Sequence, residues 1–374
     1  MEPIRLGMVG GGQGAFIGGV HRIAARLDGA FSLVAGALSS DPVRAQASAT
    51  ELGIARSYAD FRQMAQREAR RADGIEAVAI VTPNHMHAGP AIEFLKRGIH
   101  VICDKPLTAT MAEAKKLAKA AESANALFIL THNYTGYPLI RQARAMVARG
   151  DLGAIRLVQV EYVQDWLTQE VHNKQAEWRT DPARSGLGGA LGDIGTHAYN
   201  LAAFVAGMEP EQLAADTSSF VPGRALDDNA HVMLRYAGGA KGMLWASQVA
   251  PGHENGLRLR IYGDKGGLDW GQENPNQLWF TPFGEPKRLL TRNGAGAGPE
   301  AQRVSRIPGG HPEGYLEAFA TIYTEAAQAI RAHQAGLPAP EGVIYPTLAD
   351  GLKGMRFVEA CVQSARRNSG WVRL

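Results

Sequence analysis

The chain has 374 residues, of which 45% are hydrophobic and 20% are charged, and its formal net charge is +3. This composition is typical of a soluble globular protein with room for two domains, and it excludes disordered, collagen-like and fibrous chains. The 39 basic and 36 acidic residues are scattered along the sequence rather than gathered in runs. We therefore expect neither a nucleic-acid partner nor a membrane-surface partner.

The two cysteines, Cys103 and Cys361, have no metal-type spacing and no disulfide framework around them. Such sparse use of cysteine suits a reducing compartment. The N-terminus enters an apolar strand pattern without a signal-like segment, and no later run reaches about 18 uninterrupted apolar residues. These features predict a cytoplasmic protein of enzyme size, without a metal site.

Short apolar runs and helical patterns alternate over the first part of the chain. The apolar runs, of the kind that form buried strands, occur at 4–10, 32–38, 77–82, 100–104 and 127–131. The helical patterns between them occur at 15–27, 42–52, 60–71, 86–97 and 110–123. This repeated alternation predicts an α/β domain over 1–131, built on a doubly wound parallel sheet.

The pattern changes after residue 131, which predicts a second α/β domain over 132–374. Helices are expected at 138–149, 194–206, 312–335 and 346–367. Strand-like segments begin at 155–167 and continue from 213 to 291, where two runs flank the turn sequence AGGA as in a hairpin. We expect these segments to form a large, mostly antiparallel sheet with one open face, which is a natural surface for self-association.

A glycine-rich turn follows the first strand directly and precedes the first helix. Gly10, Gly12 and Ala15 match the pattern G-x-G-x-x-G/A. Glycine lets the backbone approach a pyrophosphate, whose charge then lies at the partially positive helix N-terminus. In this strand, turn and helix context the pattern predicts a dinucleotide site rather than a plain turn. The expected cofactor contacts of this turn are Gly10, Gly12, Gln13, Gly14, Ala15 and Phe16.

The end of the second strand should distinguish NAD from NADP. An NAD site usually has an acidic residue there, but here Ser39 and Ser40 follow the strand and Arg44 lies on the next helix. Two hydroxyls and a guanidinium suit a 2′-phosphate, so the pattern slightly favours NADP and leaves NAD open. Asp41 comes later and is equally explained as the N-cap of the helix that begins at Pro42.

Polar residues also follow the strand at 77–82. Pro83 restricts the backbone of Thr82, and Asn84 then reaches the edge of the sheet where open α/β sheets bind ligands. We expect Thr82, Pro83, Asn84 and His87 to line the cofactor site. His85 and His87 form an H-x-H pair without a third ligand, which does not predict a metal.

Two further motifs carry candidate chemistry. Asp104 ends the strand at 100–104 and Lys105 follows it. Pro106 restricts the lysine backbone, so that the ammonium can be aimed above the cofactor. The sequence GGALGDIGTHAYN at 188–200 separates Asp193 from His197 by four residues, which places both on one side of a helical turn. Asp193 is also expected to cap this helix, with a glycine at 207 as its stop.

Taken in this order, the glycine pattern, TPNHMH, CDKP and GGALGDIGTH resemble the Gfo/Idh/MocA oxidoreductases over essentially the whole chain. The resemblance implies a Rossmann domain, a C-terminal domain for substrate binding and oligomerisation, and a last helix that packs back on the first domain. It also implies that Lys105, Asp193 and His197 form the catalytic group beside the nicotinamide, in a homodimer or homotetramer associated through the C-terminal sheet. The common Glu before the lysine is Asp104 here, and an often acidic position is Asn200.

The predicted reaction is NAD(P)-linked hydride transfer to or from a ring hydroxyl of a sugar, a sugar derivative or inositol. His197 suits the general base because its ordinary pKa lies near the operating pH, Asp193 would orient it, and Lys105 would stabilise alkoxide charge. The expected substrate contacts are Lys105, Asn133, Tyr134, Trp166, Trp178, Arg179, Asp193 and His197. Two alternatives remain open: an NAD-dependent enzyme that cleaves glycosides by transient oxidation and elimination, and a non-catalytic cofactor-binding regulator.

Overall fold

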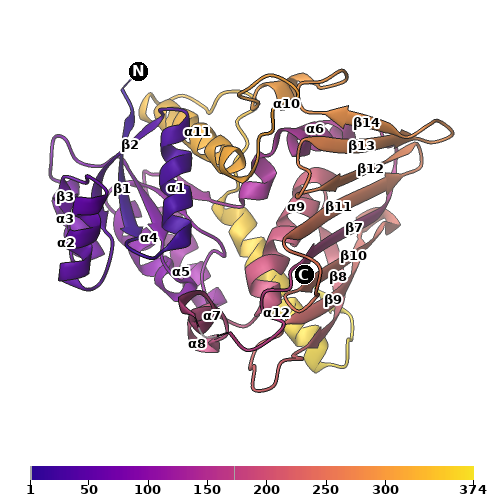
Figure 1. Cartoon of the computed structure of the whole chain (residues 1–374), viewed down its shortest axis with the longest axis horizontal. Coiled ribbons are helices and arrows are strands. Elements are labelled where there is room, and N and C mark those ends of the chain that lie inside the picture. Colours follow the sequence, from indigo (N-terminus) through magenta and orange to yellow (C-terminus); the bar gives the residue numbers. More distant parts are fainter. Residues whose placement is uncertain (1, 172) are drawn as a thin grey trace. The chain divides into compact units, whose positions relative to one another are not determined.

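The computed structural model describes residues 2–171 and 173–374, and the chain divides into two compact units (Figure 1). The first unit comprises Met1–Asn133 and Tyr315–Leu352, and the second comprises Tyr134–Gly314 and Lys353–Leu374. The helix predicted at 346–367 is observed as α12 (Leu348–Arg366), so its first residues belong to one unit and the rest to the other. The domain boundary expected after residue 131, and the packing of the last helix on the first domain, stay predictions.

The first unit is built on a six-stranded sheet in the order β3-β2-β1-β4-β5-β6, in which every pairing is parallel. The strands are β1 (Ile4–Gly10), β2 (Phe31–Ala37), β3 (Arg56–Ser57), β4 (Ala77–Val81), β5 (His100–Cys103) and β6 (Phe128–Leu130). The helices are α1 (Phe16–Leu27), α2 (Pro42–Glu51), α3 (Phe61–Glu68), α4 (Ala88–Leu95), α5 (Met111–Glu122) and α11 (Tyr315–Gln334). This arrangement confirms the predicted doubly wound sheet, and its strand order reverses between β1 and β4, the usual place for a ligand.

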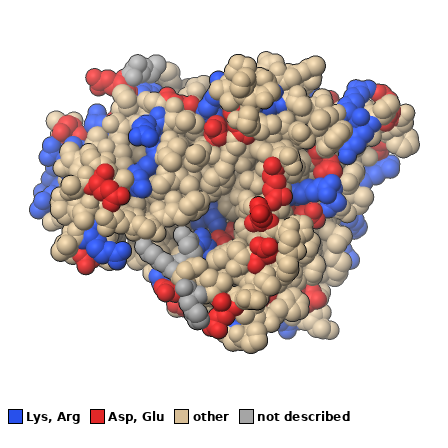
Figure 2. Space-filling model, in the orientation of Figure 1, with Lys and Arg blue, Asp and Glu red and all other residues tan. Residues whose placement is uncertain are grey.

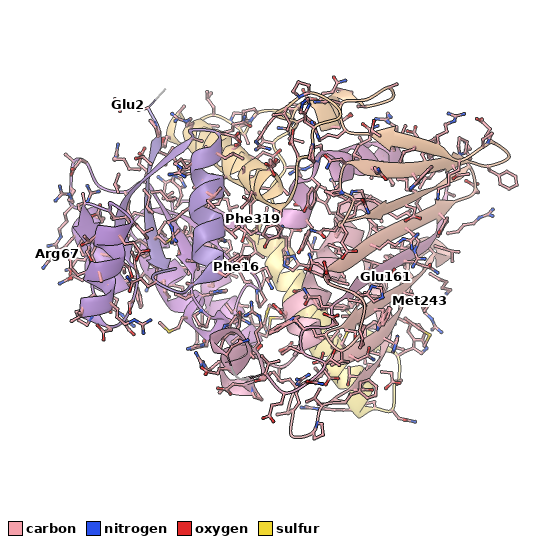
Figure 3. The ribbon with its side chains drawn as sticks, viewed as in Figure 1. Glu2, Phe16, Arg67, Glu161, Met243 and Phe319 are labelled. Atoms are coloured by element: carbon pink, nitrogen blue, oxygen red, sulfur yellow. The ribbon has the colours of Figure 1, made fainter. Side chains whose placement is uncertain are left out.

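Two features of this unit differ from the pattern in the sequence. The strand β3 has two residues, which is too short to give a hydrophobic period, and the ion pair between Arg56 and the buried Glu68 (2.8 Å) lies beside it. The late helix α11 joins the first unit, where the ring of Phe319, marked in Figure 3, lies 5.1 Å from that of His21 on α1. The core of the unit therefore joins residues that are far apart in the chain, from Ile4 to Ile330.

The second unit is built on a nine-stranded sheet in the order β14-β13-β12-β11-β7-β10-β9-β8-β15. Its strands are β7 (Ile155–Val163), β8 (Pro210–Ser218), β9 (Asn229–Tyr236), β10 (Lys241–Ser247), β11 (Gly256–Gly263), β12 (Gly266–Gly271), β13 (Gln277–Pro282), β14 (Arg288–Thr291) and β15 (Val372–Arg373). The β7 and β10 pair is parallel and the other pairs are antiparallel, as predicted for a mostly antiparallel sheet. The AGGA turn joins β9 to β10, and its Gly238 has φ +75.

Helices lie on one face of this sheet (Figure 1). They are α6 (Pro138–Ala148), α9 (Thr196–Ala206) and the later part of α12, whose Phe357 stacks on Tyr199 of α9 at 4.5 Å. Alternate residues on the other face are exposed, among them Met233 (50%) and Met243 (56%), the latter marked in Figure 3. This is the predicted open face, which follows from the period of two along each strand. The short helices α7 (Lys174–Arg179), α8 (Pro182–Ser185) and α10 (Pro299–Gln302) complete the unit.

Charges of both signs are interspersed on the face of the molecule in Figure 2. This distribution agrees with the scattered basic and acidic residues of the sequence. Among the described residues, no helix has the length and apolar character required to cross a membrane.

The buried His100 should make the first unit sensitive to acid. Burial and the neighbouring His333 lower the pKa of His100 to about 4, and its Nδ1 accepts a hydrogen bond from the Leu127 amide (2.9 Å). Because this folded-state pKa lies below the ordinary value of about 6.5, the contribution is present above pH 6.5 and is lost as the pH falls toward 4. Replacing His100 with asparagine, which keeps an acceptor, should remove about 2 kcal/mol of the acid-induced loss of unfolding free energy. Urea unfolding at several pH values measures this loss, and the exposed His311→Asn is the control. If the unfolding free energy of His100→Asn fell with acid as steeply as that of wild type, the prediction would be contradicted.

Candidate active site

The turn between β1 and α1 requires glycine for two reasons. Gly10, Gly11 and Gly14 have positive φ angles of +82, +74 and +74 degrees, a region that favours glycine. At Gly12, an added Cβ would lie 2.7 Å from the carbonyl oxygen of Leu38. A pocket of about 350 Å³ lies against this turn and the start of α1. Since close backbone and a helix N-terminus suit a pyrophosphate, the residues present fit a dinucleotide cofactor.

Two predicted contacts of this turn have different surroundings. The Gln13 amide donates to the Ser48 hydroxyl (3.1 Å), and its side-chain Nε2 donates to Glu51 (2.8 Å), so Gln13 is tied to α2. Phe16 lines the same pocket at the start of α1, and 65% of it is exposed (Figure 3). Phe16 therefore offers an apolar surface, whereas the side chain of Gln13 is engaged within the protein.

The residues after β2 include a helix cap. The Asp41 carboxylate accepts a hydrogen bond from the Arg44 amide (3.0 Å), which is the N-cap interpretation of this residue. The Ser39 hydroxyl accepts from the Asp41 amide (3.1 Å), while Ser40 and Arg44 are exposed at the start of α2. The hydroxyl of Ser40 and the guanidinium of Arg44 thus lie on the surface of the first unit, as a contact with a cofactor requires.

His87 joins two loops at the carboxyl ends of the strands. Its ring nitrogens lie 2.8 Å from the carbonyl oxygens of Pro106 and Thr82, and its side chain is buried. Burial lowers the pKa of His87, although the carboxylate of Asp104 opposes this effect. The imidazole therefore connects the loop after β4 to the loop that carries Lys105. Asn84, in the short helix η1 (Asn84–Met86), is also buried in the loop after β4.

Asp104 holds the backbone of Lys105 at the end of β5. Its Oδ1 accepts from the Lys105 amide (2.9 Å) and from the Thr131 hydroxyl (3.1 Å). Burial would raise the pKa of Asp104, but the neighbouring His21, whose Nε2 lies 3.9 Å from Oδ1, and the charges of Lys105 and His87 lower it to about 2. An ionised carboxylate therefore lies directly beside the lysine. Asn133, the last residue of this part of the unit, is buried, and its Nδ2 has no hydrogen-bond partner among the described residues.

The segment with Asp193 and His197 begins with a π-helical turn, η3 (Leu191–Gly195), which leads directly into α9. The expectation that Asp193 caps this helix is wrong, because the helical turn begins before it and the Asp193 amide already donates to the Gly189 carbonyl (2.9 Å). The cap is Asp227, whose carboxylate accepts from the amides of Gly189 (2.7 Å) and Leu191 (2.8 Å). The predicted helix stop is correct, since residue 207 is a glycine in the left-handed conformation.

The carboxylate of Asp193 receives two donors on the same oxygen. Arg179 Nε lies 3.2 Å and Gln248 Nε2 lies 3.0 Å from its Oδ2. The guanidinium of Arg179 also lies over the indole of Trp178 at 4.3 Å and near that of Trp166 at 6.0 Å. The structure thus brings three of the predicted substrate contacts together beside Asp193, and it engages Arg179 with this carboxylate.

His197 is buried against aromatic rings. Its imidazole meets the ring of Tyr134 edge-on at 4.8 Å and lies 6.2 Å from that of Tyr162. The two tyrosine hydroxyl oxygens are 2.5 Å apart, and Tyr162 donates to the side-chain oxygen of Asn255 (2.8 Å). Burial raises the pKa of Tyr134, which keeps this phenol protonated. The rings of Tyr134 and Tyr162 therefore hold the imidazole of His197 from one side.

Comparison with known proteins agrees with both units. Residues 4–132 match the model of an oxidoreductase family with an NAD-binding Rossmann fold, and residues 140–269 match the GFO/IDH/MocA C-terminal domain. An oxidoreductase from Sinorhizobium meliloti is 64% identical in sequence, with a TM-score of 0.92 and full coverage of both chains. The chain belongs to the Gfo/Idh/MocA family of oxidoreductases.

The names of two relatives state what those proteins bind or act on. An inositol dehydrogenase homolog from Azotobacter vinelandii, solved with NADH and myo-inositol, is 39% identical over 100% of this chain and 98% of that one, with a TM-score of 0.92. The levoglucosan dehydrogenase of Pseudarthrobacter phenanthrenivorans is 28% identical over 100% of this chain and 98% of its own length.

Several polar residues in the second unit of the chain were not identified from the sequence. Gln248, Gln164, Asn255 and Asp227 lie in no motif, and each acts through a contact with a residue distant in the chain. The one available signal for Gln248 was a polar residue at the end of an apolar strand. Among the described residues, no cluster of three or more His, Cys, Asp or Glu side chains is arranged to hold a metal ion.

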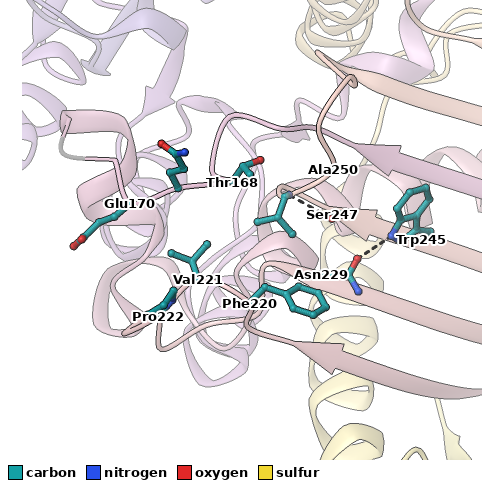
Figure 4. Close-up of a pocket in the computed structure, with 11 residues that line it drawn as sticks. Thr168, Glu170, Phe220, Val221, Pro222, Asn229, Trp245, Ser247 and Ala250 are labelled. Atoms are coloured by element: carbon teal, nitrogen blue, oxygen red, sulfur yellow. Dashed lines mark hydrogen bonds between the residues drawn. The ribbon is translucent and has the colours of Figure 1, made fainter.

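A second pocket, of about 720 Å³, lies in the same unit (Figure 4). Trp245, Ser247, Val249 and Phe220 are among the residues that line it. The indole nitrogen of Trp245 donates to the side-chain oxygen of Asn229 (2.9 Å). Gln248 is not among the lining residues, because alternate residues of this segment point to opposite sides and its side chain reaches Asp193 instead.

Proposed function

We propose that the protein is an NAD(P)-dependent dehydrogenase that transfers hydride between the nicotinamide and a ring hydroxyl of a sugar, a sugar derivative or inositol. In this proposal, His197 takes the hydroxyl proton, Asp193 orients the imidazole and stabilises its charged form, and Lys105 stabilises the developing alkoxide. When bound, the cofactor supplies the hydride acceptor or donor.

The observation that carries the proposal is the setting of the partly buried Asp193 and the buried His197. They lie four residues apart at the junction of η3 and α9, where a carboxylate with two donors and an imidazole fixed by Tyr134 share one segment. π-Helical turns are rare and occur frequently at functional sites. The relative solved with NADH and myo-inositol supports a polyol as the substrate. Oxidation of a secondary alcohol requires a base that takes the hydroxyl proton and a substrate held in a fixed position. Positioning can lower the reaction barrier by about 7–11 kcal/mol.

The proposed cofactor site lies around the glycine turn, with Gly10, Gly12, Gly14 and Ala15 at its base and Phe16 as an apolar contact. The carboxyl-end loops would add Thr82, Pro83, Asn84, Asp104 and Lys105, and His87 acts through the loops that it connects. Ser39, Ser40 and Arg44 slightly favour NADP, as does the name of a scyllo-inositol 2-dehydrogenase (NADP(+)) that is 26% identical. Complexes of the Azotobacter homolog with NAD⁺ and NADH favour NAD.

The proposed substrate contacts are Lys105, Asn133, Tyr134, Trp166, Trp178, Arg179, Asp193 and His197. The two indoles can stack on the apolar face of a sugar ring. Arg179 has a further role in this proposal: because its Nε is bound to Asp193, it holds the catalytic carboxylate in addition to donating to hydroxyls.

The test is a panel of monosaccharides, inositols and glycosides, each incubated separately with NAD⁺ and with NADP⁺. We expect reduced cofactor to accumulate with at least one cyclic polyol or sugar and one of the two cofactors. Cleavage of a glycoside without accumulation of reduced cofactor would favour the eliminating enzyme. Binding of cofactor without turnover of any compound would favour the regulator and contradict the proposal.

The open face of the nine-stranded sheet is the proposed surface for a homodimer or homotetramer. Exposed apolar side chains on its central strands, including Met233, Met243 and Tyr262, support this assignment. The cytoplasmic location stays a prediction from cysteine usage and from the sequence near the N-terminus.

A further inference from the structure

Gln248 is a buried glutamine whose backbone is fixed on both sides. Only 2% of the residue is exposed. Its amide donates to the Asp228 carbonyl (2.8 Å), and its own carbonyl accepts from the Leu167 amide (3.1 Å). It directly follows β10, which is paired with β7 on one side and with β9 on the other. The side chain therefore extends toward Asp193 from a rigid element.

The hydrogen bonds determine the orientation of the Gln248 amide. The indole of Trp166 can only donate, and it lies 3.0 Å from Gln164 Oε1, so that atom is an oxygen. The Gln248 atom 3.4 Å from the same oxygen must then be the amide nitrogen, which also lies 3.0 Å from Asp193 Oδ2. Gln248 therefore gives one hydrogen to each of two acceptors, and Asp193 accepts from it as a carboxylate.

The same hydrogen bonds continue toward His197. Gln164 Nε2 donates to the side-chain oxygen of Asn255 (2.9 Å), which also accepts from Tyr162 (2.8 Å). The Tyr162 hydroxyl is paired with that of Tyr134, and the ring of Tyr134 packs against His197. A chain of buried and partly buried polar side chains thus leads from Asp193 to the tyrosine ring that packs against the imidazole, within the second unit.

We propose that Gln248 is a positioning residue that holds Asp193 ionised and correctly oriented for the reaction. This inference rests on the proposed function. It adds a positioning residue to the predicted catalytic group of Lys105, Asp193 and His197. Arg179 also donates to Asp193 Oδ2, but it comes from the short helix α7 and 22% of its side chain is exposed. Gln248 supplies the donor from the sheet, so the carboxylate keeps its place independently of α7.

The decisive variant is Gln248→Glu, which preserves shape and replaces the donor with an ionisable oxygen. At low pH the new carboxyl group is protonated and can still donate to Asp193. As the pH rises, two carboxylates would face each other, which raises the apparent pKa of the pair by roughly 1–3 units. We therefore expect kcat/KM of the variant, relative to wild type, to fall at least about tenfold between pH 6 and pH 9.

Gln363→Glu is the matched control, since it makes the same change at an exposed glutamine on α12 in the second unit. Its pH profile should follow that of wild type. A purely structural role of Gln248 would instead lower the activity of Gln248→Glu by the same factor at every pH, and that result would overturn the proposal.

Thermal unfolding provides a second readout that does not depend on turnover. The melting temperature of Gln248→Glu should fall below that of wild type increasingly as the pH rises. The double variant Asp193→Asn with Gln248→Glu restores one amide facing one carboxylate and should remove this pH dependence, while activity stays low. A loss of stability that is independent of pH, or that the double variant does not reverse, would overturn the proposal. If wild type oxidises no polyol, the proposed function fails, and the unfolding experiment still decides the role of Gln248.

Discussion

Replacing Lys105 with methionine should lower kcat by about 10²–10³-fold, with little change in the affinity for the cofactor. Methionine keeps most of the length and apolar stem of the side chain and removes the ammonium that would stabilise the alkoxide. The setting of Lys105 favours a large effect. Its backbone is held by Asp104, whose pKa of about 2 keeps a negative charge beside the lysine throughout the working pH range.

Steady-state kinetics on a substrate identified from the panel measures this effect, together with a fluorescence titration of the cofactor. Lys116→Met is the control, because Lys116 is an exposed lysine on α5 of the same unit. Unchanged turnover of Lys105→Met would end the assignment of Lys105 to the reaction. An equal rise in the dissociation constant of the cofactor would instead limit the role of Lys105 to cofactor binding and remove it from the chemical step.

The first unit could be predicted closely from the sequence because its determinants are local. Each buried strand is a short apolar run, and the glycine turn must follow β1 because Gly10, Gly11 and Gly14 adopt positive φ angles. The parallel pairing of the five predicted strands then follows from right-handed crossovers between them. The strand β3 was missed since two residues carry no period, and its pairing with β2 is set by the sheet.

The start of the segment with Asp193 and His197 could not be predicted, because its cap comes from a distant residue. Asp193 has the residue type and position of an N-cap, so local rules favour that role. In the folded chain, the carboxylate of Asp227 already accepts from the amides of Gly189 and Leu191. At Gly189, an added Cβ would lie 2.1 Å from the Asp227 carbonyl oxygen. Close approach of Asp227 therefore accounts for this glycine.

The sequence likewise identified Asp193 and His197 without the residues that hold them. Gln248 is 55 positions from Asp193 and Asn255 is 93 positions from Tyr162, so neither contact leaves a spacing signal. For Arg179, the residue type was identified correctly as a donor, but its observed acceptor is the carboxylate of Asp193. Side-chain chemistry can be inferred from single residues, whereas the choice of partner depends on the sheet and loops that bring two segments together.

Replacing His197 with alanine should lower kcat by about 10²–10⁴-fold, because proton transfer by a positioned base contributes an effect of this size. The cofactor affinity should change little, since His197 and its aromatic neighbours lie in the second unit and the glycine turn lies in the first. Removal of the ring also leaves a space beside Tyr134. Added imidazole should therefore enter this space and restore part of the lost turnover.

The rescue separates a base from a structural residue. If His197 takes the proton, the restored rate should rise with the concentration of neutral imidazole, and hence with pH through the ordinary pKa of about 6.5–7. A melting temperature close to that of wild type would show that the variant is folded. His311→Ala, at an exposed histidine, is the control and should keep full activity. Turnover that stays at the wild-type level in His197→Ala would refute the role of His197. A folded variant with reduced activity and no response to imidazole would make the ring a packing element for Tyr134, and Asp193 or Lys105 would then have to accept the proton.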